Sequence, residues 1–140
     1  MNIAIPTFRS RVSPRFDLAA GLLIVRVQGN RVLGRGEERL DNIYGWRRIR
    51  FLTSRNVNVV LCGGIRRCDY FAIMDSGIDV YAGLMGEIED VLEAFLRGDI
   101  VTNGNGHALK GRGWRQARWR GGRGGPGRGR GPRNEITDRQ

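Results

Sequence analysis

The residues best suited to chemistry lie in a turn that reads Cys62-Gly63-Gly64. The turn follows a β-branched apolar run at residues 57–61 and precedes a segment with helical spacing that stops at Gly77. A strand that ends where a helix begins presents free backbone N–H groups and the positive end of the helix dipole. That potential would favour the thiolate form of Cys62, and the glycines would let a ligand approach the backbone. The turn is therefore the first candidate for a binding site, with a buried core thiol as the equally common alternative for Cys62.

A second cysteine, Cys68, follows Cys62 after five intervening residues, in or near the first turn of the predicted helix. Soft thiolates suit metal-sulfur chemistry, so both cysteines are candidate metal ligands. The C-x5-C spacing is not typical of metal sites, and packing of Cys68 on the helix is the alternative. Arg66 and Arg67 either frame an anion or are solvated. His107, the only histidine, lies in a probable linker, so no Ser-His or Cys-His catalytic set is predicted and we expect no enzymatic activity.

The elements that position this turn follow from the alternation and spacing of apolar residues. Strands are predicted at residues 2–6, 22–28, 31–40, 57–61 and 78–81, and residues 7–17 are predicted to be a polar loop. Gly29-Asn30 is a hairpin signal, so the strands on either side of it should pair antiparallel. The connection from residues 57–61 to residues 78–81 has the length of a helix, so these two strands should be parallel with a right-handed crossover.

Helical spacing also occurs in two other segments. Residues 86–97 have apolar side chains at i, i+3, i+4, i+7 and i+8, acidic residues in the first turn, and Gly98 after the last turn. Residues 43–55 form a second predicted helix, which Asp41 or Asn42 can cap. Its apolar stripe consists of Ile43, Trp46, Ile49 and Leu52. Its arginines, which point elsewhere, are Arg47, Arg48, Arg50 and Arg55. This pattern is typical of a surface helix with a solvated basic face, and an anion-binding patch is the alternative.

Strands grouped early in the chain and then alternating with helices predict an α/β fold. A mixed sheet of about five strands should be covered by helices on both faces. Ligands of open sheets bind at the carboxyl ends of the strands. Thr7, the turn at residues 62–64, and residues 82–86 would all lie at that edge, so three loops should converge on one site.

The charge of the chain is unevenly distributed and divides it into two parts. Residues 1–99 hold 14 arginines and 12 acidic residues, a net charge of +2, whereas residues 100–140 hold 10 basic and 2 acidic residues, a net charge of +8. Half of the 22 glycines also lie in the second part. We therefore predict one folded domain at residues 1–99 and a flexible, disordered Gly/Arg-rich tail at residues 100–140.

The tail interleaves arginine with Trp114 and Trp119 in the sequence GRGWRQARWRGGRGG. Guanidinium groups neutralise phosphates and indoles stack on bases, so a nucleic-acid-binding tail is one hypothesis. A disordered solvating extension is the alternative that the composition favours. A third hypothesis is that the tail folds back over an anionic ligand or docks on an acidic partner protein.

No apolar run approaches the length of a membrane-spanning helix, and the amino terminus has the pattern of a strand and not of a signal peptide. We expect a soluble, cytoplasmic protein that has no contact with membranes. Its two cysteines are then more compatible with free thiols or metal ligands than with a disulfide. The sequence leaves the oligomeric state open.

An ordered set of segments resembles the family of dinitrogenase iron-molybdenum cofactor biosynthesis proteins, which includes NifX-like proteins and the carboxyl-terminal part of NifB. The segments are MNIAIPT, SPRF, LLIVRV, VVLCGGI, SGIDVYAG and LEAFLRG, and they extend over nearly all of residues 2–98. The resemblance implies a three-layer, ribonuclease H-like α/β sandwich without nuclease function. It also implies an accessory or carrier role with an iron-sulfur, iron-molybdenum or, as in the orange protein of sulfate reducers, molybdenum-copper-sulfide cluster. The partners would be cofactor-assembly or recipient proteins, and the isolated protein can lack its cluster.

The resemblance also indicates which residues would hold the cluster. The family typically has a histidine in the loop motif that here reads SPRF, and Arg15 occupies its place. A guanidinium does not ligate metal, but it pairs with the sulfur or oxo groups of an anionic cluster. The predicted cofactor-binding residues are Thr7, Arg15, Cys62, Gly63, Gly64 and Gly83, with backbone donors between Gly83 and Gly86.

Overall fold

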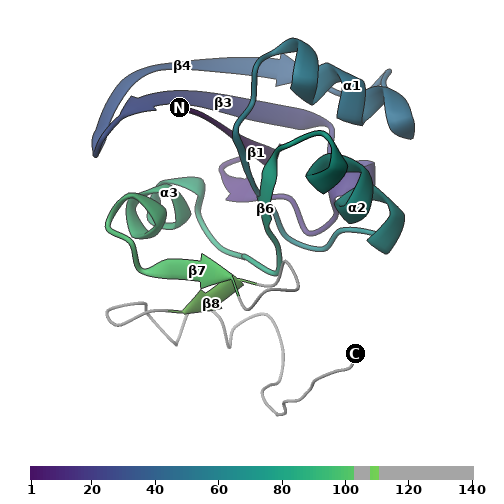
Figure 1. Cartoon of the computed structure of the whole chain (residues 1–140). Coiled ribbons are helices and arrows are strands. Elements are labelled where there is room, and N and C mark those ends of the chain that lie inside the picture. Colours follow the sequence, from purple (N-terminus) through teal and green to yellow (C-terminus); the bar gives the residue numbers. More distant parts are fainter. Residues whose placement is uncertain (103–107, 111–140) are drawn as a thin grey trace.

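The computed structural model of the chain describes residues 1–102 and 108–110, which are built around one mixed β-sheet (Figure 1). The strands of this sheet are β1 (Asn2–Phe8), β2 (Arg11–Val12), β3 (Gly21–Gln28), β4 (Arg31–Arg39), β5 (Val59–Leu61) and β6 (Asp79–Tyr81). Five of them have the order β4-β3-β1-β5-β6, and β2 pairs with the end of β1. β1 is antiparallel to β3 and parallel to β5, and β6 is parallel to β5. The predicted mixed sheet of about five strands is confirmed.

The central position of β1 explains its unbroken apolar sequence. Ile3, Ala4 and Ile5 are each 0 % exposed, because strands lie on both sides of β1 and helices cover both faces. The β3–β4 hairpin turns at the predicted Gly29-Asn30, where Gly29 has a φ of +62°. The turn needs this left-handed conformation, which glycine adopts without strain.

Three helices cover the sheet: α1 (Trp46–Ser54), α2 (Arg67–Asp75) and α3 (Ile88–Leu96). α3 packs with Val25, Val27 and other residues in a core on one face of the sheet, and α1 and α2 share a second core on the other face (Figure 1). Side chains of successive strand residues point to opposite faces, so Ile3 and Ile5 belong to the first core and Ala4 to the second. The α/β sandwich predicted from the sequence is therefore confirmed.

The first helix differs from its prediction in its start and in the burial of two side chains. Its N-cap is Gly45, with a φ of +60° and no side-chain cap, so neither Asp41 nor Asn42 caps it. Trp46, predicted to be buried, is 61 % exposed, whereas Arg48, predicted to be solvated, is 2 % exposed. Ile49 and Leu52 are buried as predicted, and Arg48 lies beside them under the chain that precedes the helix, where three backbone carbonyl groups accept its hydrogen bonds.

Two segments predicted to lack regular structure contain short elements. β1 continues to Phe8, and the predicted loop that follows contains β2 and the 3-10 helix η1 (Phe16–Leu18). β7 (Ile100–Thr102) and β8 (Ala108–Lys110) form an antiparallel hairpin at the start of the predicted tail. The rest of that tail, with both of its tryptophans, and His107 lie outside the described residues. Within the described ranges, no helix has the length and apolar character needed to cross a membrane.

Candidate anion-binding site

The three loops predicted to converge do meet, but they are bonded to one another. Phe16 donates its N–H to the carbonyl of Gly64 at 2.8 Å, and Gly83 donates to the carbonyl of Gly63 at 2.9 Å. Val12 donates to the carbonyl of Gly86 at 3.0 Å, which joins the first and third loops. The carboxyl edge of the sheet is therefore closed by backbone contacts among its own loops.

Cys62 lies inside this closed edge. Its side chain is 0 % exposed and belongs to the core that contains Phe16 and Ile73. Its N–H donates to the carbonyl of Tyr81 at 2.9 Å, and its own carbonyl accepts from Leu84 at 3.0 Å. Burial raises the pKa of the thiol to about 12, because the apolar surroundings disfavour the thiolate. Of the two alternatives for Cys62, a thiolate ligand or a core thiol, its burial favours the core thiol.

Gly63 and Gly64 are required for contact with the chain itself. A Cβ at Gly63 would lie 2.5 Å from the carbonyl oxygen of Ser13, and one at Gly64 would lie 2.8 Å from that of Pro14. The N–H of Gly64 donates to the Pro14 carbonyl at 2.8 Å. Because these two residues have no side chains, the loop at residues 13–16 can pack directly against the turn. It occupies the space in which a ligand was predicted to bind.

Cys68 is exposed, so the two cysteines do not face a common site. No group of three or more His, Cys, Asp or Glu side chains in the described part of the chain is arranged to hold a metal ion. The proposed pair of metal ligands, Cys62 and Cys68, is therefore not supported by the geometry. Direct coordination of a metal needs a fuller set of ligands than this surface offers.

Two other predicted site residues have structural roles. Thr7 belongs to β1, not to a loop, and its side chain lies against Gly21, where an added Cβ would be 2.5 Å from the Thr7 hydroxyl. Gly83 is exposed and has a φ of +83°, and its N–H already bonds to Gly63. The N–H of Gly83 is therefore not free to bind a ligand.

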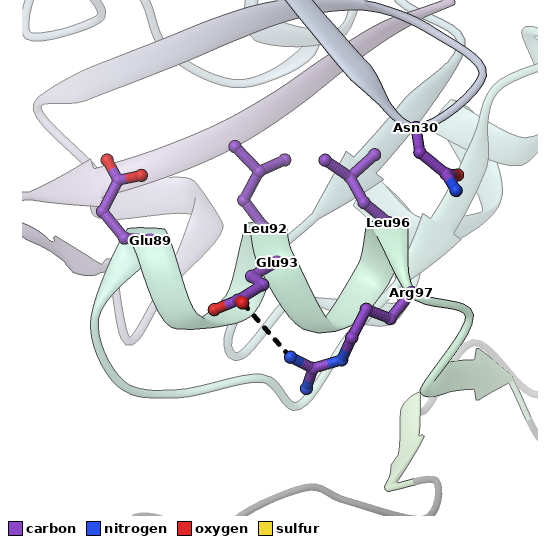
Figure 2. Close-up of a pocket in the computed structure, with 6 residues that line it drawn as sticks. All are labelled: Asn30, Glu89, Leu92, Glu93, Leu96 and Arg97. Carbon is purple, nitrogen blue, oxygen red and sulfur yellow. Dashed lines mark ion pairs between the residues drawn. The ribbon is translucent and has the colours of Figure 1, made fainter.

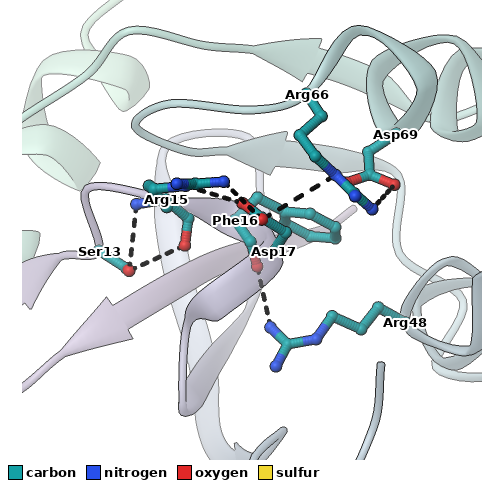
Figure 3. Close-up of polar contacts among 7 residues, drawn as sticks. All are labelled: Ser13, Arg15, Phe16, Asp17, Arg48, Arg66 and Asp69. Atoms are coloured by element: carbon teal, nitrogen blue, oxygen red, sulfur yellow. Dashed lines mark hydrogen bonds and ion pairs between the residues drawn. The ribbon is translucent and has the colours of Figure 1, made fainter. Parts of the chain in front are cut away.

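Arg15 is the predicted site residue that reaches the surface with unused donors, and it is part of a charged cluster (Figure 3). Its Nε and Nη2 donate to the two carboxylate oxygens of Asp17 at 3.1 and 2.7 Å. Arg66 approaches the same carboxylate, with Nε 3.9 Å from Asp17 Oδ2, and donates to Asp69 at 3.0 and 3.3 Å. Two loops distant in sequence thus bring two guanidinium groups to one carboxylate.

The cluster retains hydrogen-bonding capacity toward a ligand. Arg15 and Arg66 have side chains that are 55 % and 48 % exposed. Each uses Nε and Nη2 for its carboxylate, so within the described residues Nη1 of each has no hydrogen-bond acceptor. Burial raises the pKa of Asp17, but the hydrogen bonds from Arg15, a backbone bond and the nearby charges outweigh it, so the net pKa lies below its ordinary value. The carboxylate therefore stays ionised and fixes both arginines in place.

The loop that carries Arg15 is held from below by a buried arginine. Arg48 donates from Nη1 to the Phe16 carbonyl at 2.8 Å and from Nη2 to the Leu40 carbonyl at 3.0 Å. A third bond joins Nε to the carbonyl of Ile43 at 2.6 Å. Sequence reasoning missed Arg48, because nothing in the sequence distinguishes it from the neighbouring arginines. Arg15 and Arg66 balance the charges of Asp17 and Asp69, and the buried Arg48, which bonds only to backbone carbonyls, leaves the five groups of Figure 3 with a net charge of +1.

The chemistry of this donor set is specific. Guanidinium N–H groups bind oxyanions and sulfide anions by charge-assisted hydrogen bonds and do not coordinate metal. The geometry therefore fits an anion that brings its own metal ligands, and it does not fit a bare metal ion.

A groove of about 270 Å³ lies elsewhere, beside α3 (Figure 2). It is lined by Asn30, Glu89, Leu92, Glu93, Leu96 and Arg97. None of these residues belongs to the charged cluster, so the groove is a separate feature.

Comparison with known proteins identifies relatives of this chain. The family described as dinitrogenase iron-molybdenum cofactor matches residues 1–98. Among solved structures, PH0822 is 24 % identical with a TM-score of 0.68, over 81 % of this chain and 97 % of its own. A Methanocaldococcus jannaschii protein assigned as a dinitrogenase is 22 % identical with a TM-score of 0.60, over 70 % and 89 % of the two chains. A Thermotoga protein assigned as NifB is 23 % identical with a TM-score of 0.54, over 69 % and 88 %. No curated protein matches the chain.

Proposed function

Since its match spans residues 1–98, the chain belongs to the dinitrogenase iron-molybdenum cofactor family, and we propose that it binds an anionic metal-sulfur cofactor or precursor as a carrier. In this proposal the protein holds its cargo for an assembly or recipient protein and does not convert it. The cargo would be a cluster of the iron-molybdenum, molybdenum-copper-sulfide or iron-sulfur type.

The observation that carries the proposal is the meeting of Arg15 and Arg66 at Asp17 on an exposed surface. Sulfide and oxo groups of a cluster carry negative charge, and the free Nη1 groups would donate to them. Asp17 and Asp69 orient the guanidinium groups before the ligand arrives, which reduces the side-chain entropy lost on binding.

The proposed site is therefore not the Cys62 turn predicted from the sequence but the exposed surface formed by Arg15 and Arg66. The metals of the cluster would keep their own sulfide ligands and would be held through ionic hydrogen bonds. Cys68 is exposed and lies two residues after Arg66, so within the described residues it is the cysteine able to add a bond to a cluster at this surface.

Binding of tetrathiomolybdate, with and without copper, tests the proposal under anaerobic conditions. Equilibrium dialysis followed by visible absorption and metal counting gives the affinity. We expect Arg15→Gln and Arg66→Gln each to weaken binding about tenfold, since a hydrogen bond to a charged group contributes roughly 1.5–3 kcal/mol and 1.4 kcal/mol corresponds to a factor of ten.

Arg47→Gln is the matched control, because it removes the same charge from an exposed position on α1. Cys62→Ala should bind like the wild type, and Cys68→Ala reports whether the exposed thiol contributes. If Arg15→Gln and Arg66→Gln bind as tightly as Arg47→Gln, the charged cluster is not the site and the proposal fails.

A second function remains associated with the tail, because residues 108–133 contain nine basic residues, two tryptophans and no acidic residue. This composition favours sequence-independent binding of nucleic acid, with an affinity that falls steeply as salt is added. Deletion of residues 111–140 should abolish such binding, and unchanged affinity after the deletion would exclude it.

A further inference from the structure

The groove beside α3 has an apolar floor and a charged rim. In Figure 2 the side chains of Leu92 and Leu96 point to the same side of the helix, toward the β3–β4 turn that carries Asn30. Leu92 is 3 % exposed and Leu96 is partly buried, so Leu96 forms the open part of this floor. The groove holds about 270 Å³, enough for a large side chain but small for a separate organic ligand.

The rim belongs to the most acidic stretch of the chain. Residues 87–99 contain five acidic residues and one arginine, in a protein whose net charge is +10. Glu89 pairs with Arg35 at 2.6 Å and Glu93 pairs with Arg97 at 3.3 Å, yet the two carboxylate side chains remain 69 % and 68 % exposed. Exposed pairs of this kind exchange partners at little cost, so the rim can accept further cations.

The described chain ends beside this groove. Lys110, the last residue of β8, pairs with Ile100 of β7, and β7 contacts α3. Figure 1 shows the β7–β8 hairpin next to α3, on the side where the helix ends. Trp114 follows four residues after Lys110, and four extended residues span about 13 Å, so Trp114 lies within about 13 Å of the end of β8.

We propose that residues 112–119, with the sequence RGWRQARW, dock in the α3 groove of the same chain. Trp114 packs on the open side of Leu96, and Arg115 and Arg118 pair with the carboxylates of the rim. An indole offers a large apolar surface and two arginines match the acidic rim, whereas nucleic acid would be repelled by the same carboxylates. The docked segment is then withheld from other partners.

This inference does not rest on the proposed cofactor function, because the groove shares no residue with the charged cluster. It does make a statement about the tail. Docking and nucleic-acid binding would compete for the same arginines, so the groove would lower the affinity of the full chain for nucleic acid.

The test uses the full chain with one tryptophan retained. Trp46→Phe and Trp119→Phe leave Trp114 as the only indole, and Trp46 is largely exposed, so its replacement leaves the core intact. At low ionic strength we expect the Trp114 emission to be shifted to shorter wavelength and protected from acrylamide. In 1 M salt the Debye length falls to about 3 Å, so the protection should decrease.

Glu93→Lys in this background should remove the emission shift and restore quenching. Asp75→Lys is its matched control, since it makes the same change at an exposed position on α2, and it should leave both readouts unchanged. Circular dichroism of both variants verifies that the fold is retained.

Three outcomes would overturn the inference. One is emission and quenching of Trp114 like those of free tryptophan at low salt. Another is protection that depends on protein concentration, which would show that the groove takes the tail of a second copy. Protection that Glu93→Lys leaves intact would likewise place Trp114 at a different surface.

Discussion

Replacement of Arg48 by methionine should be among the most damaging single substitutions at the charged cluster. Arg48 is 2 % exposed, and one of its three hydrogen bonds joins α1 to Phe16, in the loop that carries Arg15. The other two join α1 to Leu40 and Ile43, in the segment that precedes the helix. Methionine has a similar length and retains much of the packing of the side chain, but it has no N–H donors. The substitution therefore isolates the polar contribution of the guanidinium.

The magnitude follows from the three bonds. Bonds that involve a charged group contribute at least about 1.5 kcal/mol each, which gives about 4.5 kcal/mol for three. Burial of the guanidinium lowers the pKa of Arg48, which shows that its desolvation opposes folding, and methionine avoids that cost. The Phe16 and Leu40 carbonyls also keep bonds from Ala19 and Ile43. We therefore expect a net loss of about 3 kcal/mol in the free energy of unfolding.

Urea denaturation followed by circular dichroism measures this loss. With an m-value of about 1–2 kcal/mol/M for a domain of this size, the unfolding midpoint should fall by roughly 1.5–3 M. Arg47→Met is the control on the adjacent exposed position and should change the stability by less than about 0.5 kcal/mol. If Arg48→Met is as stable as Arg47→Met, the three bonds do not hold the loop and the reasoning is refuted.

Two further predictions concern the closed edge of the sheet. Under native conditions a disulfide reagent should modify Cys68 rapidly and Cys62 only after unfolding. The reason is that Cys62 is 0 % exposed and burial raises the pKa of its thiol to about 12. Rapid labelling of the native Cys68→Ser variant would contradict this prediction. Gly63→Ala places a Cβ 2.5 Å from the Ser13 carbonyl oxygen and should destabilise the protein by about 1–3 kcal/mol in the same urea assay. The control is Gly36→Ala, whose Cβ meets nothing within 4 Å and which should be nearly neutral. Equal stabilities of the two variants would disprove the contact.

The sequence alone was sufficient for the class of fold and the positions of most elements. Apolar periodicity depends on neighbours along the chain, so the strand at β1, the turn at Gly29 and the helix at α3 were all predictable. The ordered motifs also identified the family, because they are spread over the region that the family match covers.

The convergence of three loops at the carboxyl edge was also predictable from the sequence, because it follows from topology. Whether those loops bind a ligand or one another was not predictable. A glycine turn has the same sequence whether a ligand or another loop packs against it. Here Ser13 and Pro14, about 50 residues earlier in the chain, pack against the turn.

Only the tertiary structure decided which arginines are buried, exposed or paired. Arg47 and Arg48 are adjacent and chemically identical, yet Arg47 is in solvent, whereas Arg48 is buried against the Phe16, Leu40 and Ile43 carbonyls. Likewise Cys62 and Cys68 differ in exposure because one ends a buried strand and the other begins a surface helix. Charge and burial at a site depend on contacts between segments distant in sequence, and local pattern contains no information about those contacts.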